Sequence, residues 1–202
     1  MMKKLLCTAA VLLVLLTPLA AMAEGVQTYA AKDGSLSFAY PTDWMVLSRD
    51  TIDAMMEAAA SMEDVKALVE SVRPQIEQSN LVIVMNSDGT ANVNLLIQDV
   101  EAELTGDDLL SMAPAIQQSL KQQIDTAEFA DEPALTTLGN RQAMLLQWAY
   151  TLADIDFAAI QAYMPMGTDL VTCTLTLSAF DDALIESALG VLEMMLTTLE
   201  AA

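Results

Sequence analysis

The hydrophobic pattern of the chain follows two periods, and the period of two predicts β-strands. The clearest case is residues 170–179, where Val171, Cys173, Leu175 and Leu177 alternate with small hydroxyl-bearing residues. Comparable stretches predict strands at residues 27–32, 36–40, 44–48, 81–86, 90–100 and 144–152, and a further strand that begins at residue 155. Short turns with glycine or aspartate separate neighbouring strands at residues 33–34, 87–89, 154 and 167–168. Strands connected in this way form antiparallel sheets.

The period of 3.6 residues predicts helices at residues 50–60, 61–76, 107–124 and 181–200. Pro114 lies inside the third helix and is tolerated near a helix start, so we expect Ser111 to be the N-cap. In the last helix, Glu186, Glu193 and Glu200 lie opposite the apolar stripe, on the side predicted to face solvent. The order of strands and helices predicts an α+β fold, with an antiparallel β-sheet and helices packed on it.

Residues 1–23 have the three parts of a cleavable secretory signal. Two lysines form a positive start, and an apolar stretch follows at residues 5–16. Pro18 ends that stretch, and Ala21-Met22-Ala23 places small residues where a signal peptidase cuts. The stretch is shorter than the roughly 20 residues of a membrane-spanning helix. We therefore expect cleavage after Ala23, a secreted or periplasmic protein of one domain over residues 24–202, and no membrane insertion after cleavage.

The exported part of the chain is strongly acidic. Cleavage removes Lys3 and Lys4 but no acidic residue, so six basic residues remain against 28 acidic ones and the net charge becomes −22. Binding to phosphate requires clustered lysine and arginine, so nucleic acid and anionic lipid surfaces are excluded as partners. The acidic residues are scattered, which is typical of a solvated surface that keeps a protein soluble; attraction to cations or basic proteins is the alternative.

Residues 36–44 read Leu-Ser-Phe-Ala-Tyr-Pro-Thr-Asp-Trp, an aromatic strand followed by a proline and a tryptophan. This stretch and the order of elements resemble PsbP-like domains, the fold group of the photosystem II extrinsic protein and of a Ran-binding nuclear import factor. The resemblance implies a PsbP-like α/β/α sandwich and packing roles for Phe38, Tyr40, Pro41 and Trp44. It implies no photosynthetic or nuclear role, because no binding residues of those proteins can be placed on this chain.

Several kinds of chemistry are excluded by residue type. The chain has no histidine, which removes histidine-based nucleophilic triads and histidine-ligated metal sites. Cys173 is the one thiol left after cleavage, so no disulfide can form within the chain. Because it alternates with Val171 and Leu175 on an apolar strand face, we expect a buried, unreactive thiol. No glycine-rich phosphate loop is present.

Two remaining motifs contain acidic residues. Residues 86–92 alternate oxygen-bearing side chains like a calcium loop, but the glycine is misplaced for an EF-hand and a hairpin turn explains Asp88-Gly89. The pairs Asp154 with Asp156 and Asp181 with Asp182 could serve a glycosidase. Such pairs are expected by chance in so acidic a chain, and the second pair fits the start of the last helix.

These observations predict an exported, non-catalytic binding or interaction module, with no cofactor, metal or catalytic residue assigned. Its partner would be an unidentified protein or a small apolar ligand. The first alternative is a carrier of a small apolar ligand, in a pocket between the sheet and a methionine-rich helix with Met55 and Met56. The second is a carboxylate-based hydrolase, which requires two facing acids in an aromatic cleft.

Overall fold

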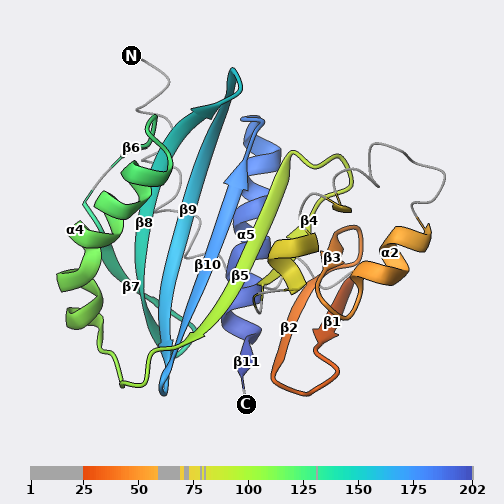
Figure 1. Ribbon diagram of the computed structural model, residues 1–202, viewed down its shortest axis with the longest axis horizontal. Helices are drawn as coiled ribbons and strands as arrows, with labels where there is room; N and C mark the ends of the chain where they lie inside the picture. The colour runs from red at the N-terminus through yellow and green to blue at the C-terminus, as the bar shows by residue number, and fades with distance from the viewer. Residues whose placement is uncertain are drawn as a thin grey trace.

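The computed structural model describes residues 25–58, 69–70, 73–77, 79, 81–130 and 132–201. The predicted signal and most of the second predicted helix lie outside the described residues. Figure 1 shows the long strands of a large sheet across the centre of the molecule. Helix α4 (Gly106–Gln123) lies in front of one side of this sheet, and helix α5 (Asp182–Thr198) lies behind its middle.

The large sheet has eight strands in the order β3-β4-β5-β10-β9-β8-β6, and β7 also pairs with β8. The strands are β3 (Met45–Leu47), β4 (Leu81–Met85), β5 (Ala91–Asp99), β6 (Glu128–Phe129), β7 (Ala134–Leu138), β8 (Arg141–Leu152), β9 (Ile155–Met166) and β10 (Asp169–Leu177). Every pairing is antiparallel, which confirms the predicted fold class. The predicted turn at Asp154 joins β8 to β9, with Ala153 and Asp154 at φ values of 50° and 63°.

A second, three-stranded sheet contains β1 (Val26–Ala30), β2 (Leu36–Pro41) and β11 (Glu200–Ala201) in the order β1-β2-β11. Gly34 has a φ of 73° in the turn between β1 and β2, as the Asp-Gly pair predicted. The Phe38 ring is 1% exposed and its centroid lies 5.1 Å from that of Tyr29 and 6.1 Å from that of Tyr40. Trp44, three residues after the end of β2, is 5% exposed in the same core, so both aromatic residues have the packing role that the resemblance implied.

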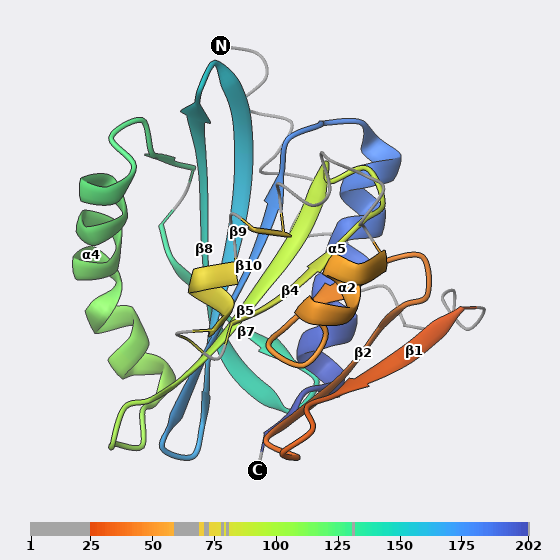
Figure 2. The same ribbon diagram turned by 45° about the vertical axis from the view of Figure 1, so that its right-hand side comes forward.

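The helices follow from local sequence, with two corrections. Ile52 of helix α2 (Ile52–Ala58) and Ile76 of the helical residues 73–77 share a small core with strands β3 and β4. On the opposite side of the large sheet from α4 (Figure 2), α5 begins at Asp181, one of the two acids predicted to cap it, which accepts a hydrogen bond from the Leu184 amide at 2.9 Å. The prediction that Ser111 caps the third helix is wrong. Thr105 is the N-cap of α4, and it exchanges capping-box hydrogen bonds with Asp108.

Pro114 therefore lies in the third turn of α4 rather than at its start. A proline removes one backbone N–H and crowds the preceding turn. The capping box and the buried Leu109 and Ala113 stabilise the helix before Pro114, and Ile116 and Leu120 pack against the same core after it. The Ser111 hydroxyl donates instead to the Asp108 carbonyl oxygen at 2.7 Å. The local capping box of Thr105 and Asp108 marks where this helix starts.

The two faces of the large sheet have separate cores. We call the face packed against α4, Val69 and Ile76 the front face, and the face packed against α5 the back face. The back-face core joins the large sheet, α5 and the small sheet, because α5 contacts β2 as well as β5, β7 and β10. For this reason α5 is buried on more than its predicted stripe, including Leu189, Met194 and Leu196.

Glu193 departs from the prediction that it faces solvent. Its side chain is half-buried beside Leu192 and Leu196 in an apolar part of the α5 surface. Burial raises the pKa of the Glu193 carboxyl, because the charged form loses hydration there. Glu186 and Glu200 are exposed, as predicted.

Candidate functional site

Polar side chains cross the middle of the front face, between the parts covered by helices. They come from the adjacent strands β5, β10 and β9, and each is half-buried. We call this set the polar strip; it consists of Asn92, Asn94, Gln161, Thr172, Thr174 and Thr176. In Figure 1 the three strands lie between α4 on one side and helical residues 73–77 on the other.

The register of the sheet brings these residues together. Thr174 on β10 lies opposite Asn94 on β5 and opposite Gln161 on β9, while Thr176 lies opposite Asn92. Residues opposite one another share a face because side chains alternate along each strand. The alternation over residues 170–179 predicted the threonine side of β10, but only the register shows which amide side chains lie beside it.

A short chain of hydrogen bonds runs into the strip from Tyr163, which belongs to the core under α4. The Tyr163 hydroxyl donates to Gln161 Oε1 at 2.8 Å, and Gln161 Nε2 donates to Thr174 Oγ1 at 2.9 Å. The Tyr163 pKa is raised by burial, so this hydroxyl keeps its proton. Thr174 Oγ1 therefore already accepts one bond, and its own O–H remains a donor directed by a fixed chain.

Two buried side-chain polar atoms among the described residues have no hydrogen-bond partner, and both belong to front-face residues: Asn94 Oδ1 and Trp148 Nε1. An unpaired buried polar atom costs about 1–3 kcal/mol, so proteins rarely keep one without a reason. Trp148 is 5% exposed in the core under α4. Asn94 lies in the polar strip and is half-buried as a residue, while its Oδ1 atom is buried, so a ligand reaches this acceptor only if the amide rotates.

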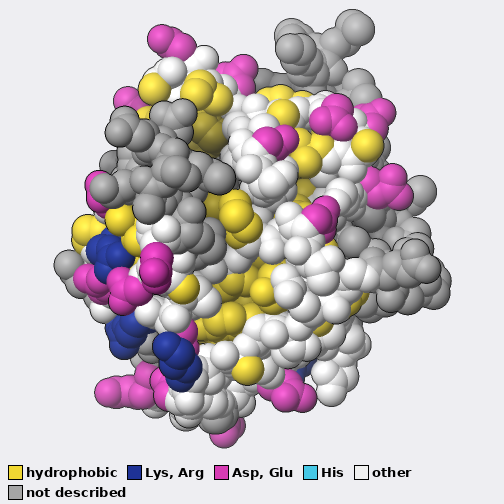
Figure 3. Space-filling model, turned by 90° about the vertical axis from the view of Figure 1, so that its right-hand side faces the viewer, with side chains coloured by type: hydrophobic (Ala, Val, Ile, Leu, Met, Phe, Trp, Pro, Cys, Tyr) yellow, Lys and Arg dark blue, Asp and Glu magenta, His cyan; other side chains and the backbone are white. Residues whose placement is uncertain are grey.

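The strip carries no charge. None of the residues of β5, β8, β9 and β10 that point to the front face is acidic or basic. Residues buried under α4 would be apolar in any protein, so the six half-exposed residues of the strip are the informative ones. Seen from the side that carries β1 and β2, acidic side chains are spread over the surface and basic ones gather at one edge (Figure 3).

Two helical walls border the strip. On one side, α4 buries Leu109 and Ala113 against β8. On the other side, Val69 and Ile76 pack on Ile83 of β4. These two apolar contacts therefore lie on either side of the strip.

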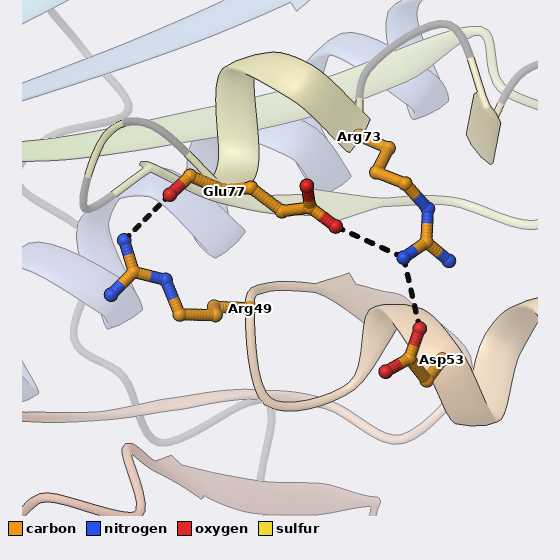
Figure 4. A network of polar contacts seen from close by, with 4 residues as sticks. All are labelled: Arg49, Asp53, Arg73 and Glu77. Carbon is orange, nitrogen blue, oxygen red and sulfur yellow. Dashed lines mark hydrogen bonds and ion pairs between the residues drawn. The ribbon is translucent and has the colours of Figure 1, made fainter.

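The second wall is joined to α2 by an ion-pair network (Figure 4). Arg73 Nη1 lies 2.9 Å from Asp53 Oδ1 and 3.0 Å from Glu77 Oε1, and Arg49 Nη2 donates to the Glu77 carbonyl oxygen at 2.8 Å. Exposed ion pairs contribute about 0–1 kcal/mol each. Their role here is geometric, because they connect residues 73–77 to α2.

Aromatic rings lie at one end of the strip. Tyr150 and Phe157 face each other across the β8–β9 hairpin, with ring centroids 4.9 Å apart and planes 13° from parallel. Burial raises the Tyr150 pKa, and the hydroxyl of Thr176 beside it partly offsets this. Both rings are half-buried, so an aromatic surface adjoins the hydrogen-bonding one.

The structure places Cys173 on the back face, away from the strip. Its side chain is completely buried among Val171 and Leu175, as the sequence predicted. Burial raises the pKa of the thiol, which disfavours the reactive thiolate.

The acidic residues considered for hydrolysis lie on the surface. Asp154 is in the β8–β9 turn, and Asp156 accepts a hydrogen bond from the Thr151 hydroxyl at 2.8 Å. Asp181 and Asp182 begin α5, where Asp181 is the cap. In the described ranges no three histidine, cysteine or acidic side chains are grouped so that they could hold a metal ion.

The calcium-like segment is a hairpin turn in the structure. Asp88 Oδ1 accepts hydrogen bonds from the amide and the hydroxyl of Thr90 at 3.0 and 2.6 Å, and Gly89 has a φ of 73°. Asn86 Oδ1 accepts from the Ala91 amide at 3.1 Å. These bonds lower the pKa of Asp88 and occupy the oxygens that a calcium ion would need.

The methionine-rich pocket falls partly outside what the structure describes. The side chain of Met55 is not described, and Met56 packs against the core that contains Ile52 and Ile76. A different hollow, between α5 and the back face, has a volume of about 10 Å³. That is room for about one water molecule, whereas small-molecule pockets have about 300–1,000 Å³. Its lining is Leu138, Leu145, Ile160, Leu189, Leu192, Glu193 and Leu196.

Comparison with known structures identifies the fold. No protein-family model and no curated protein matches the chain. The solution structure of cyanobacterial PsbP from Synechocystis sp. PCC 6803 aligns with 88% of this chain and 93% of its own, with a TM-score of 0.54 and 11% identity. The fold is PsbP-like. At this identity the likeness shows the fold alone and transfers no site residue.

Two other solved structures align with lower TM-scores. A protein from Bacteroides thetaiotaomicron aligns with 89% of this chain at a TM-score of 0.48 and 15% identity, and this chain spans about half of its length, 49%. LpqN, involved in cell envelope biogenesis of Mycobacterium tuberculosis, aligns with 83% of this chain and 88% of its own at a TM-score of 0.46 and 13% identity. No helix among the residues that the structure describes is long and apolar enough to cross a membrane.

Proposed function

We propose that this PsbP-like protein is an exported, non-catalytic binding module, and that the polar strip is its ligand-binding surface. The observation that carries the proposal is an uncharged set of half-exposed hydrogen-bonding side chains that includes an unpaired acceptor, Asn94 Oδ1. A surface that had only to stay hydrated would carry the charges that the rest of this acidic chain carries.

The absence of catalytic function is supported by residue placement. Nucleophilic catalysis needs a nucleophile within hydrogen-bonding reach of a base. Cys173 is buried on the back face, the chain has no histidine, and Asp154 and Asp156 lie at an exposed turn. The polar strip itself offers amides and hydroxyls, which bind and orient but do not titrate near neutral pH.

Export rests on residues 1–23, which the structure does not describe. N-terminal sequencing of the protein recovered from outside the cytoplasm should begin at Glu24, because Ala21 and Ala23 fit the subsites of a signal peptidase. A protein that still begins at Met1, or that carries a lipid on Cys7, would remove the basis for an extracytoplasmic location.

The binding proposal is tested by mapping changes of the backbone amide NMR signals. The ¹⁵N-labelled exported protein is mixed with a soluble extract of the producing cell's envelope. We expect amide shifts on β5, β9 and β10 at the strip, and we expect Thr174→Val to reduce them. Thr136→Val is the matched control, because Thr136 is a half-exposed strand threonine on β7 outside the strip. Shifts confined to the hollow beside α5 would favour the carrier instead, and no shift anywhere would refute the proposal.

A further inference from the structure

We propose that the ligand of the polar strip is an uncharged saccharide; this inference rests on the proposed function. The argument begins with the hydrogen-bonding groups at the centre of the strip. Thr174 offers an O–H donor, because its oxygen already accepts from Gln161. Asn94, directly opposite on β5, offers the unpaired acceptor Oδ1.

A hydroxyl group fits this pair of neighbours. It accepts from the Thr174 O–H and donates to Asn94 Oδ1 at the same time, which a carboxylate, a phosphate or an ammonium group cannot do. The adjacent row places another hydroxyl opposite another amide, because Thr176 lies opposite Asn92. A molecule with hydroxyls on successive carbons therefore matches the successive hydroxyl–amide pairs of β10 and β5.

The charge of the protein also favours an uncharged ligand. The net charge of −22 expected for the cleaved form disfavours the approach of nucleotides, uronates and other anions, and no lysine or arginine points to the front face from β5, β8, β9 or β10. Those strands place no carboxylate there to attract a cation either. A neutral ligand can approach such a surface without an electrostatic penalty.

The aromatic pair accounts for the remaining surface of a sugar. Pyranose rings have C–H-rich faces, and the half-buried Tyr150 and Phe157 lie at the end of the strip near Thr176. The two rings stack on each other, so a sugar would contact the outer face of one of them. A peptide that bound through its backbone would instead add to a sheet edge, where main-chain groups are unpaired. The strip lies in the middle of the sheet, between β4 and β8.

The extent of the strip fits a short oligosaccharide. From Thr172 to Thr176 it runs about 13 Å at roughly 3.3 Å per residue, and from β9 to β5 it spans about 10 Å at roughly 4.8 Å per strand. A chain of a few sugar units covers this area, whereas a single small polyol would contact only one row.

The test measures binding of oligomers of glucose, mannose, galactose, xylose and N-acetylglucosamine to the exported protein, with oligogalacturonate as the charged comparison. We expect at least one neutral oligomer to bind, with amide shifts at the strip, and the uronate not to bind. Loss of the Thr174 hydroxyl in Thr174→Val should weaken binding about tenfold, the equivalent of one hydrogen bond. Thr174→Ser should retain it, and Thr136→Val should change it less than twofold.

The possible outcomes distinguish a failure of the saccharide assignment from a failure of the proposed binding function. One outcome is that the envelope extract shifts the amide signals of the strip while no neutral oligomer binds, and another is that a peptide fraction of the extract accounts for the shifts. In either case the assignment of the ligand as a saccharide is wrong and the proposed function stands. If an oligomer binds but its shifts lie away from the strip, or if Thr174→Val and Thr136→Val weaken binding equally, the saccharide assignment of the strip is also wrong. If neither the extract nor any oligomer shifts the strip, both proposals fail.

Discussion

Replacing Trp44 by alanine tests whether the residue after the aromatic strand anchors the two sheets to each other. Trp44 is 5% exposed and belongs to the core shared by the small sheet, the back face and α5. Its amide donates to the Pro41 carbonyl oxygen at 3.1 Å, which closes the turn between β2 and β3. The indole is therefore held where the chain passes from the small sheet to the large one.

The magnitude follows from the area that the indole buries. A buried aromatic side chain of this size removes roughly 200 Å² from water, which at about 25 cal/mol per Å² corresponds to about 5 kcal/mol. Truncations of buried large aromatic residues to alanine cost about 3–5 kcal/mol. Because folded domains have only about 5–15 kcal/mol of net stability, Trp44→Ala should leave much of the protein near its unfolding transition.

Urea unfolding followed by circular dichroism measures this loss directly. We expect Trp44→Ala to lower the midpoint strongly without a change in slope, and Trp44→Phe, which keeps a ring in the core, to lose about 1–2 kcal/mol. A Trp44→Ala protein that loses less than about 1 kcal/mol would show that the sheets are joined by other contacts. The anchoring role would then be wrong although the residue is buried.

Three further experiments test whether single side chains are buried or exposed as the structure shows. Cys173 should react with a thiol reagent far more slowly in the folded protein than in urea, because it is completely buried; equal rates would show an accessible thiol. Burial raises the pKa of Glu193, so the charged carboxylate destabilises the fold above that pKa; Glu193→Gln should raise the melting temperature at pH 7, and the gain should disappear below about pH 4, where the unfolded chain is also protonated. A gain that persists at low pH would contradict this cause. Asp154→Asn and Asp156→Asn should each change stability by less than about 0.5 kcal/mol and leave ligand binding intact, because both are exposed; a stable variant without binding would place the site at this turn.

Local sequence was sufficient for features that depend on neighbours in the chain. The turns at Asp33-Gly34 and Asp88-Gly89 follow from the freedom of glycine at positive φ. The burial of Cys173 follows from strict alternation along β10, and the N-cap at Asp181 follows from an acid placed before an apolar helix. Each of these signals acts within a few residues, so no knowledge of the fold was needed.

The sequence pattern alone was misleading where distant segments compete with local preference. A proline is expected near a helix start, yet Pro114 lies in the third turn of α4, where the packing of the helix on β8 offsets the backbone hydrogen bond that the proline removes. Glu193 belongs to a polar stripe of the helix, but α5 contacts two sheets, so less of its surface reaches water. Burial by a second layer cannot be inferred from one helical period.

The polar strip shows the same division most clearly. The sequence by itself determined that the threonines of β10 share one side of a strand, because side chains alternate with a period of two. It did not determine that Asn94 on β5 and Gln161 on β9 lie on either side of Thr174, since these residues are far apart in the chain and strand order has no local signal. Only the tertiary structure decided that register, and with it which hydroxyl and amide groups face a ligand together.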